Sequence, residues 1–463
     1  MIQSDVFPRF VISALRGGSG KTIVSIGLIA ALKESGKIIA PFKKGPDYID
    51  AGWLALAAGR PCHNLDTFLI TPDNVKKSFL SKALHSDISV IEGNRGLFDG
   101  IDMSGNTSTA EIAKLLDAPV ILCLDCTKTT RTMAAVVCGC KAFEPDIRIA
   151  GIVLNRVAGP RHEGILTKTI EHHSGIPIVG AIPKLSSDDF PERHMGLIPT
   201  HEHQGAMESI NAAKRAATKY INLEKILDIA NSAPSMQTQY EQLADLTSSA
   251  EIRIGVLRDS AFQFYYPDNI DCFTSRGAEI IYISPLKDKE LPEIDALYIG
   301  GGFPETHAKE LSDNASFRES LKNKIEEGLP VYAECGGLMF LGRTIETDSK
   351  KHEMSGIFPL DFTISKKPQG HGYVIASPDQ PNIWFDEGVE VKGHEFRYSK
   401  VEYCGCSDKD MIYRMKRGVG IINGRDGLSY KNTLASYMHI HALGASQWIE
   451  SMLRNAKTYK QSK

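Results

Sequence analysis

The chain has 463 residues, of which 42% are hydrophobic and 24% charged, and its formal net charge is −3. This composition indicates a globular protein of two or three domains, and so small a charge argues against nucleic acid or an anionic membrane as a partner. Because no apolar run approaches the roughly 20 residues of a membrane span and the first residues lack the features of a secretory signal, we expect a cytoplasmic protein.

Residues 1–227 alternate between short apolar runs and helix-like segments. The expected strands are residues 10–14, 37–42, 88–92, 120–125, 149–155 and 178–182, and residues 22–35 and 106–116 are two of the expected helices. Strands that are apolar throughout are typical of a parallel sheet covered on both faces. In such a sheet, ligand-binding groups gather in the loops after the carboxyl ends of the strands.

A glycine-rich loop follows the first expected strand and predicts a phosphate-binding site. Its sequence is Arg16-Gly17-Gly18-Ser19-Gly20-Lys21-Thr22. Backbone N–H groups can wrap a phosphate there, Lys21 can reach the outer phosphates, and the Thr22 hydroxyl can hold Mg²⁺. The spacing departs from the usual P-loop, whose first glycine would stand at Leu15. The strand before and the helix after favour a site for ATP or GTP over a glycine-rich turn that merely carries a lysine.

Further polar groups follow neighbouring strands of the same predicted sheet. Because Mg²⁺ prefers oxygen ligands, we expect Asp47 and Glu92 to complete its site with Thr22. For Asp47 or Asp50 the alternative is a capping role in a turn or helix. Asn155 is expected either to contact the adenine or to cap the following turn. The residues expected to face the substrate are Lys43, Asp50, Arg95 and Asp99.

The composition changes after residue 227. Residues 228–250 are small and polar and include a proline, which predicts a linker. A second α/β pattern occupies residues 251–446, with expected strands at 252–257, 279–283, 296–299 and 330–334. Residues 447–463 are expected to form a C-terminal tail, which is basic and polar from Leu453 to Lys463 and is expected to be frayed there.

A strand, a sharp turn and an apolar helix are predicted around Cys335, which stands at the turn. This arrangement exposes a sulfur for nucleophilic attack, although a lone cysteine is more often structural. A second glycine-rich loop, at residues 300–305, can present a backbone N–H beside that of Gly336. We expect Gly302, Phe303 and Gly336 to form an oxyanion hole.

Two histidines are expected to serve this cysteine. His439 and His441 lie two residues apart in an expected strand, so they would point to one face. One would deprotonate Cys335 and the other would orient the first. Metal binding by the two histidines is the alternative, and no third ligand is obvious.

These motifs together carry a family resemblance. The second half resembles a class I glutamine amidotransferase domain, and the whole chain is similar to the cobyrinic acid a,c-diamide synthase family, a dethiobiotin-synthetase-like ATPase fused to such a glutaminase. The matching stretches are residues 43–50, 92–100, 300–305, 332–339, 393–399 and 436–441. The departures are Arg16-Gly17, Asn94-Arg95, and Arg397 in place of a histidine. Arg95 and Arg397 are expected to lie near a carboxylated substrate.

The resemblance implies a P-loop NTPase-type domain followed by a glutaminase-like α/β domain. It implies that Lys21, Thr22, Asp47 and Glu92 position MgATP while a substrate carboxylate becomes an acyl phosphate. Cys335, activated by His439, would release ammonia from L-glutamine to form the amide. A tetrapyrrole polycarboxylate is the implied substrate, and a homodimer is a further expectation. Hydrogenobyrinic acid, nickel-sirohydrochlorin, the cobyric acid synthase reaction, and a partition-type switch ATPase with an inactive glutaminase-like module remain alternatives.

Overall fold

The computed structural model describes residues 2–185, 192–193, 196–197, 200, 205–239 and 251–463. The chain divides into two compact units, Met1–Gln242 and Leu243–Lys463. Each unit has its own sheets and its own apolar core. The two units are described separately below.

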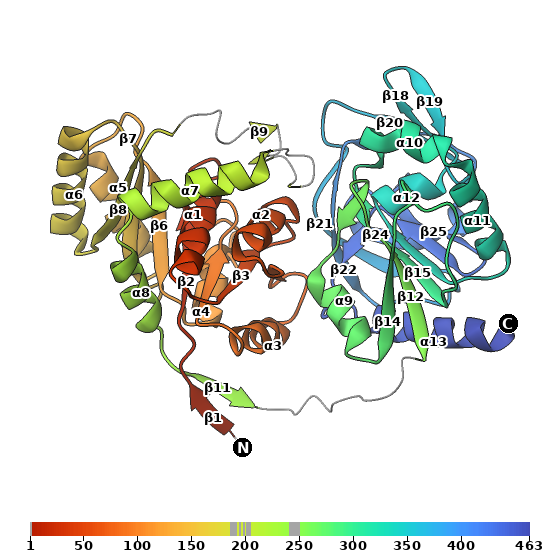
Figure 1. Ribbon diagram of the computed structural model, residues 1–463, viewed down its shortest axis with the longest axis horizontal. Coiled ribbons are helices and arrows are strands. Elements are labelled where there is room, and N and C mark those ends of the chain that lie inside the picture. Colours follow the sequence, from red (N-terminus) through yellow and green to blue (C-terminus); the bar gives the residue numbers. More distant parts are fainter. Residues whose placement is uncertain (1, 186–191, 194–195, 198–199, 201–204, 240–250) are drawn as a thin grey trace. The chain divides into compact units, whose positions relative to one another are not determined.

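The first unit is built on a seven-stranded parallel sheet, which confirms the predicted fold class (Figure 1). The strand order is β4 (His63–Leu65), β3 (Ile39–Lys44), β5 (Ile88–Glu92), β2 (Arg9–Ala14), β6 (Val120–Asp125), β7 (Ile149–Val157) and β8 (Ile178–Pro183). Every residue of β2, β3 and β5 is buried, as expected for strands covered on both faces. The predicted strands were confirmed to within two residues at each end, but the three-residue β4 was missed.

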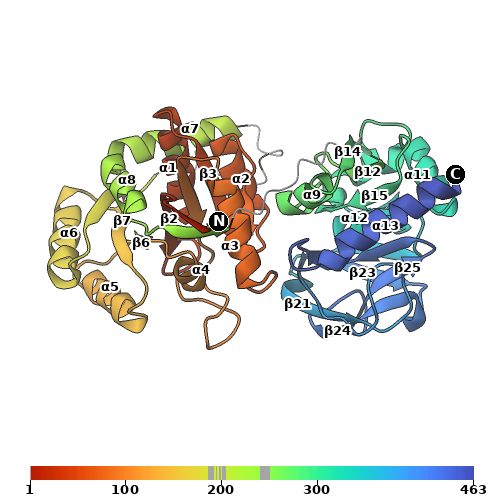
Figure 2. The ribbon, with the colours of Figure 1, turned by 90° about the horizontal axis from the view of Figure 1, so that it is seen from below.

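Helices cover both faces of this sheet (Figure 2). One face carries α1 (Lys21–Glu34), α2 (Ile49–Ala58), α7 (Ala206–Tyr220) and α8 (Leu223–Asn231), whose apolar residues share one core with the sheet. The other face carries α3 (Pro72–Ala83), α4 (Thr109–Leu115), α5 (Thr132–Phe143) and α6 (Pro160–Ser174). Two short strands, β9 (Glu192–Arg193) and β10 (Gly196–Leu197), pair with each other and lie between β8 and α7 in the chain.

The predicted linker begins too early. Helix α8 runs past residue 228, and β11 (Met236–Gln239) pairs antiparallel with β1 (Ile2–Asp5). These residues therefore belong to the first unit. The rest of the predicted linker, residues 240–250, lies outside the described residues.

The second unit contains a ten-stranded mixed sheet. Its first five strands are parallel: β14 (Ala278–Ile283), β12 (Ile252–Leu257), β15 (Ala296–Ile299), β17 (Val331–Glu334) and β26 (Thr433–Ser436). Antiparallel pairing continues the sheet through β25 (Arg425–Tyr430), β24 (Met411–Arg417), β21 (Gly370–Pro378), β22 (Val391–Arg397) and β27 (His439–Ile440).

Smaller elements complete this unit. A four-stranded sheet consists of β19 (Lys350–Glu353), β18 (Thr344–Thr347), β20 (Leu360–Ile364) and β23 (Ser399–Cys404), and β13 (Phe262–Phe264) pairs with β16 (Gly301–Gly302). The helices are α9 (Pro267–Thr274), α10 (Ala308–Asp313), α11 (Ala315–Glu326), α12 (Gly336–Leu341) and α13 (Ser446–Ser462), with 3₁₀ turns at Pro304–His307 and Asp408–Asp410.

The predicted strand over residues 436–441 is two strands. Strand β26 ends at Ser436, and β27 begins at His439 but pairs with β22. Two residues span less than about 10 Å, so β22 must lie close to the end of β26. The antiparallel part of the sheet therefore curves back and brings His439 beside the parallel part.

The predicted C-terminal tail is helix α13, which continues to Ser462 with Ala456 and Tyr459 buried, so the expected fraying from Leu453 to Lys463 was wrong. Its buried residues include Trp448, Ile449 and Met452, which belong to a core cluster of the second unit. The Trp448 ring lies 5.0 Å, centroid to centroid, from the rings of both Tyr298 and Tyr332. The tail is basic only on its exposed face, because its apolar residues recur with the helical period.

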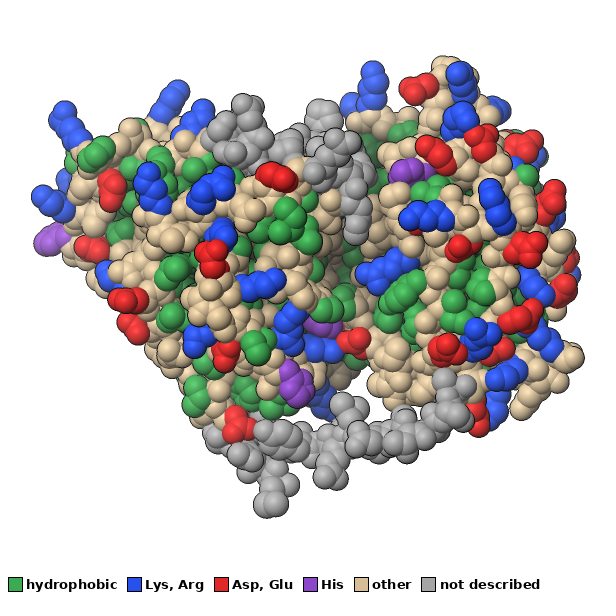
Figure 3. Space-filling model, viewed as in Figure 1, with side chains coloured by type: hydrophobic (Ala, Val, Ile, Leu, Met, Phe, Trp, Pro, Cys, Tyr) green, Lys and Arg blue, Asp and Glu red, His purple; other side chains and the backbone are tan. Residues whose placement is uncertain are grey.

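The surface agrees with the small net charge. On the face drawn in Figure 3, side chains of Lys and Arg are interspersed with those of Asp and Glu on each unit. Among the described residues, no helix has both the length and the apolar character to cross a membrane.

We expect Trp448→Ala to lower the stability of the second unit by about 3–5 kcal/mol, because it removes a fully buried aromatic side chain. Lys457→Ala, at an exposed position of the same helix, is the matched control and should change stability little. Denaturant unfolding followed by tryptophan fluorescence and circular dichroism measures both. Equal stability of the two variants would contradict the packing role of α13.

Candidate active sites

The glycine-rich loop of the first unit joins β2 to α1. Gly18 and Gly20 adopt positive φ angles of 70° and 90°, which glycine accommodates without strain. Helix α1 has no capping side chain at its N-terminus and no acidic residue in its first turn, so its positive dipole end is not offset. Lys21 begins this helix and is buried, and burial together with the nearby Lys43 lowers its pKa. A bound phosphate would complement the positive end of the α1 dipole and the charge of Lys21.

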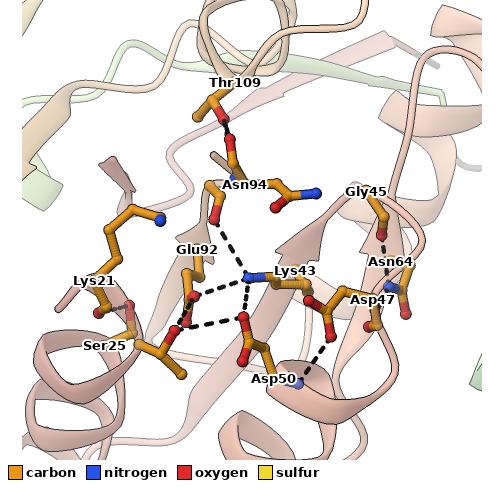
Figure 4. A network of polar contacts seen from close by, with 12 residues as sticks. Lys21, Ser25, Lys43, Gly45, Asp47, Asp50, Asn64, Glu92, Asn94 and Thr109 are labelled. Carbon is orange, nitrogen blue, oxygen red and sulfur yellow. Dashed lines mark hydrogen bonds and ion pairs between the residues drawn. The ribbon is translucent and has the colours of Figure 1, made fainter. Parts of the chain in front are cut away.

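A buried network of charges lies beside Lys21 (Figure 4). The Thr22 hydroxyl donates to Glu92 Oε1 at 2.8 Å and lies 3.4 Å from Asp50 Oδ2. Lys43 Nζ donates to the same two carboxylates, at 2.6 Å from Asp50 Oδ2 and 2.8 Å from Glu92 Oε1. Strands β3 and β5 bring Lys43 and Glu92 together, because these residues are paired in register.

The electrostatics of this network follow from burial and pairing. Burial alone would lower the pKa of Lys43, but Asp50 and Glu92 raise it well above its usual value. Burial alone would raise the pKa of Asp50, but the Lys43 ammonium group lowers it overall. Both groups are therefore held in their charged forms.

Asp47 does not take the place predicted for it next to Thr22. Its Oδ1 accepts a hydrogen bond from the backbone N–H of Asp50 at 2.9 Å, the turn role left open from the sequence. Burial and the charge of Asp50 raise the pKa of Asp47 to about 7. Asp50, expected to face the substrate, is the aspartate beside Thr22.

The residues present fit Mg²⁺. One buried carboxylate oxygen, Glu92 Oε2, has no hydrogen-bond partner. Thr22 Oγ1 and Asp50 Oδ2 add further oxygen atoms within 3.4 Å of each other. Hard oxygen donors of this kind are the ligands that Mg²⁺ prefers.

The surrounding loops are braced by residues that the sequence did not single out. Asn64, on β4, donates to the carbonyls of Gly45 and Asp47 at 2.8 and 3.0 Å. The Thr109 hydroxyl exchanges hydrogen bonds with the backbone of Asn94. Their signal was weak, because single Asn and Thr residues are common in loops and helix starts.

The other two predicted substrate residues lie in the loop after β5. Arg95 is exposed and has a φ angle of 51°, an uncommon backbone conformation for a residue other than glycine. Asp99 Oδ2 accepts the backbone N–H of Gly96 at 2.9 Å, which closes the turn. Asp99 therefore has a structural role within the loop, and its contact with a substrate stays a prediction.

Two further predicted nucleotide contacts, Asn155 and Arg16, link the glycine-rich loop to the ends of neighbouring strands. The Asn155 amide donates to the carbonyl of Ser19 at 2.8 Å. Arg16 is three-quarters exposed and its Nη2 lies 3.5 Å from Asp125 Oδ2. Asp125 and Asn155 are paired in register at the ends of β6 and β7.

Cys335 stands at the sharp turn predicted for it in the second unit. It lies between β17 and α12, with φ 46° and ψ −96°, a strained conformation for a residue with a side chain. Its N–H donates to the carbonyl of Ser436 at 2.7 Å, which ties the turn to the neighbouring strand. The sulfur thus stands at the end of the parallel sheet, as in other nucleophile turns of α/β folds.

His439 is the histidine that faces Cys335, and the residue that orients it is Glu334. His439 Nδ1 lies 3.4 Å from Glu334 Oε2, and both side chains are almost completely buried. Burial would lower the pKa of His439, but hydrogen bonding to Cys335 and to Glu334 raises it to about 10. Glu334 is itself fixed, because it accepts from the Ile440 N–H at 3.1 Å and the Tyr298 hydroxyl at 3.0 Å.

His441 does not occupy the orienting position predicted for one of the two histidines. Its Nε2 lies 3.8 Å from Asp268 Oδ2, and its ring lies 4.8 Å from that of Tyr266. A third histidine, His394, stacks on His439 with ring centroids 4.8 Å apart. The signal for Glu334 was its place directly before Cys335, at the end of an otherwise apolar strand.

The second glycine-rich loop packs against His439 and against Gly336, the residue after Cys335. A Cβ on Gly301 would lie 2.4 Å from His439 Cε1, and a Cβ on Gly336 would lie 3.0 Å from the backbone nitrogen of Gly302. The structure therefore brings Gly302 close to Gly336, next to Cys335, and the oxyanion hole stays a prediction. The Phe303 side chain packs on Phe264, with ring centroids 5.1 Å apart.

Arg397 is not an exposed charge for a substrate. It is buried, donates to the carbonyls of Ser399 and Gly420 at 2.6 and 2.7 Å, and lies 3.7 Å from the ring centroid of Tyr437. These contacts stabilise β22 and its neighbours. The expectation that Arg397 lies near the carboxylated substrate was wrong.

Comparisons with known proteins agree with both sites. Residues 10–198 match the family described as "CobQ/CobB/MinD/ParA nucleotide binding domain". Residues 253–447 match the "CobB/CobQ-like glutamine amidotransferase domain". The two matches contain the glycine-rich loop and Cys335, respectively.

Curated relatives match over nearly the whole chain, and each is named cobyrinate a,c-diamide synthase. The protein from Magnetococcus marinus is 42% identical over 96% of this chain and 97% of its own length. Those from Archaeoglobus fulgidus and Listeria innocua are 37% and 39% identical, over 98% and 94% of this chain and 98% and 96% of their own lengths. With the fold, the glycine-rich loop and the Cys335 site in agreement, the chain belongs to the cobyrinate a,c-diamide synthase family.

Proposed function

We propose that the protein amidates the a and c acetate carboxylates of a cobyrinate-type tetrapyrrole, a step of cobalamin biosynthesis, with ATP and glutamine. The observation that carries this proposal is the presence of two complete and different sites in one chain. One is a phosphate-binding loop with carboxylates beside Thr22, and the other is a cysteine with a histidine and an orienting glutamate. Carboxylates do not react with ammonia at neutral pH without activation, so the two sites serve one reaction.

The second unit supplies ammonia. The Cys335 sulfur attacks the carboxamide carbon of glutamine, and the N–H groups of Gly302 and Gly336 stabilise the developing oxyanion. His439, held protonated by Glu334, gives its proton to the departing ammonia. Water then hydrolyses the thioester to glutamate, with His439 accepting its proton.

The first unit activates the carboxylate. An oxygen of the substrate acetate attacks the γ-phosphorus of ATP, ADP leaves, and ammonia then displaces phosphate from the acyl phosphate. Lys21 and the N–H groups of the glycine-rich loop bind the phosphates and offset the charge that develops on them. Thr22, Glu92 and Asp50 would hold Mg²⁺, which neutralises phosphate charge when it is bound. Lys43 donates to both carboxylates and lowers the pKa of Asp50.

A substrate panel tests the proposal directly. Cobyrinic acid, hydrogenobyrinic acid and nickel-sirohydrochlorin are each incubated with ATP and glutamine. Mass spectrometry of the products then gives the number of amides added. Two added amides on cobyrinic acid are expected. Release of no ammonia from glutamine, or addition of no amide to cobyrinic acid, would contradict the proposal.

We expect Cys335→Ser to lower glutamine-dependent amidation by about 1000-fold or more and to leave ammonia-dependent amidation close to wild type. The reason is that only the glutaminase step uses the sulfur. Cys406→Ser, in the same unit and outside the site, is the matched control. Loss of both activities in a folded Cys335→Ser protein would show that ammonia release and amidation are not carried out at separate sites as proposed.

Lys21→Met should impair amidation itself and leave the hydrolysis of glutamine intact. It keeps much of the apolar side chain but removes the ammonium group, so amidation should fall by about 100-fold or more with either nitrogen donor. Glutamate release from glutamine should persist in the variant. Normal ammonia-dependent amidation by Lys21→Met would contradict a role of this lysine in phosphate transfer.

Glu334→Gln should move the pH profile of glutamine hydrolysis. The glutamate is one of the groups that raise the pKa of His439 to about 10, so His439 in wild type keeps its proton up to that pH. Without the negative charge this pKa falls, and the alkaline loss of activity should begin at lower pH. An unchanged alkaline limb, measured by glutamate release between pH 6 and 10.5, would exclude Glu334 as the orienting group.

A further inference from the structure

The ring of His439 is held by atoms from two other strands. The His394 ring stacks on one face of it, with centroids 4.8 Å apart and an angle of 19° between the ring planes. At the Cε1 edge, a Cβ on Gly301 would lie only 2.4 Å from His439 Cε1, so a side chain there would displace the ring. His394 and His439 are 5% and 2% exposed. The imidazole of His439 is therefore held both at a face and at an edge.

The stack of the two rings follows from the pairing of β22 with β27. His394 and His439 lie directly opposite each other in this antiparallel pair, so their side chains project from the same face of the sheet. A Cβ on Gly393 would lie 2.4 Å from the His439 carbonyl oxygen, so a larger residue there would push the two strands apart. Strand register and one glycine thus bring the His394 ring onto His439.

Residues at the start of α9 fix the His394 ring from its other side. The hydroxyl of Tyr266, which is fully buried, lies 3.1 Å from His394 Nδ1. The amide of Asn269, one turn further on, donates to the carbonyl of Ile440 at 3.0 Å, directly after the histidine that faces the cysteine. The same short segment therefore holds the stacked ring and the backbone of β27.

The two stacked rings differ in charge. Burial, with the neighbouring charges of His439 and His371, lowers the pKa of His394 well below its usual value. His439 keeps its proton up to a pH of about 10. A neutral His394 ring stacks on the charged one without repulsion between like charges, and it is too weak a base to serve as a second proton acceptor. Its contribution is therefore geometric.

We infer that His394 is a positioning residue for the glutaminase site, whose stacked ring keeps His439 in the plane from which it reaches both Cys335 and Glu334. The inference rests on the proposed role of Cys335 and His439 in glutamine hydrolysis. Without the stack the His439 ring can tilt, and small misplacements of a catalytic group are costly. The Cys335 thiolate would also be less populated, because a nearby imidazolium favours it.

The test removes the ring but keeps a hydrogen-bonding group in its place. In His394→Asn the amide can still reach the Tyr266 hydroxyl, whereas His394→Phe keeps a flat ring and loses that contact. The kcat for glutamate release from glutamine should fall about 10-fold or more in His394→Asn, with KM changed less than about threefold. His394→Phe should stay closer to wild type. His371→Asn, at an exposed histidine of the neighbouring strand β21, is the matched control and should behave as wild type.

A second measurement reports on the sulfur itself. Alkylation of Cys335 by iodoacetamide at neutral pH is followed by peptide mass spectrometry, which separates it from the other cysteines. It should slow in His394→Asn and much less in His394→Phe, because the thiolate depends on the position of His439. Ammonia-dependent amidation does not use this site and should stay at the wild-type level in both variants.

The other outcomes overturn the inference. A higher KM with unchanged kcat and alkylation would identify His394 as a glutamine contact, and wild-type behaviour of His394→Asn would remove it from the site. Equal losses in His394→Asn and His394→Phe would exclude the stack. Thermal unfolding checks that the variants are folded; if His394→Asn does not fold, His394→Leu, which fills the space without a flat ring, should show the same losses. A wild-type protein that releases no glutamate would instead overturn the proposed glutaminase activity itself.

Discussion

Both sites depend on one constraint, a buried strand that passes into a helix through a turn too tight for ordinary backbone angles. In the first unit β2 reaches α1 through Gly18 and Gly20, and in the second β17 reaches α12 through Cys335. Such a turn points the N-terminus of a helix at the loop that precedes it, where an anion or an oxyanion can be stabilised. The parallel sheets then bring polar groups from neighbouring strand ends to the same edge.

Both sites contain buried charges that lie beside charges of opposite sign. Glu92 and Asp50 share the ammonium group of Lys43, and Glu334 lies beside His439. A buried ion pair of this kind adds little net stability, but removal of one partner is costly. These pairs are therefore better explained by function: the first keeps the Asp50 carboxylate ionised beside Thr22, and the second keeps a proton on the histidine next to Cys335.

The two units hold their site residues in place in different ways. In the first, the register of β3 and β5 brings Lys43 beside Glu92. In the second, the curved end of the sheet carries His439 back to Cys335, and α13 packs its Trp448 against Tyr298, which in turn donates to Glu334. The C-terminal helix thus stabilises the layer of side chains that orients the catalytic histidine.

The sequence by itself determined the fold class, most strands of the first sheet, the glycine-rich loop and the positions of Cys335 and His439. These features depend on local patterns, namely runs of buried residues, glycines at a turn and a cysteine between a strand and a helix. Only the tertiary structure decided that Asp50 rather than Asp47 lies beside Thr22, that Glu334 rather than His441 orients His439, and that Arg397 is buried. Those choices depend on which strand ends meet and which way each side chain points. A spacing of two or three residues along the chain does not specify either, because register and curvature are properties of the whole sheet.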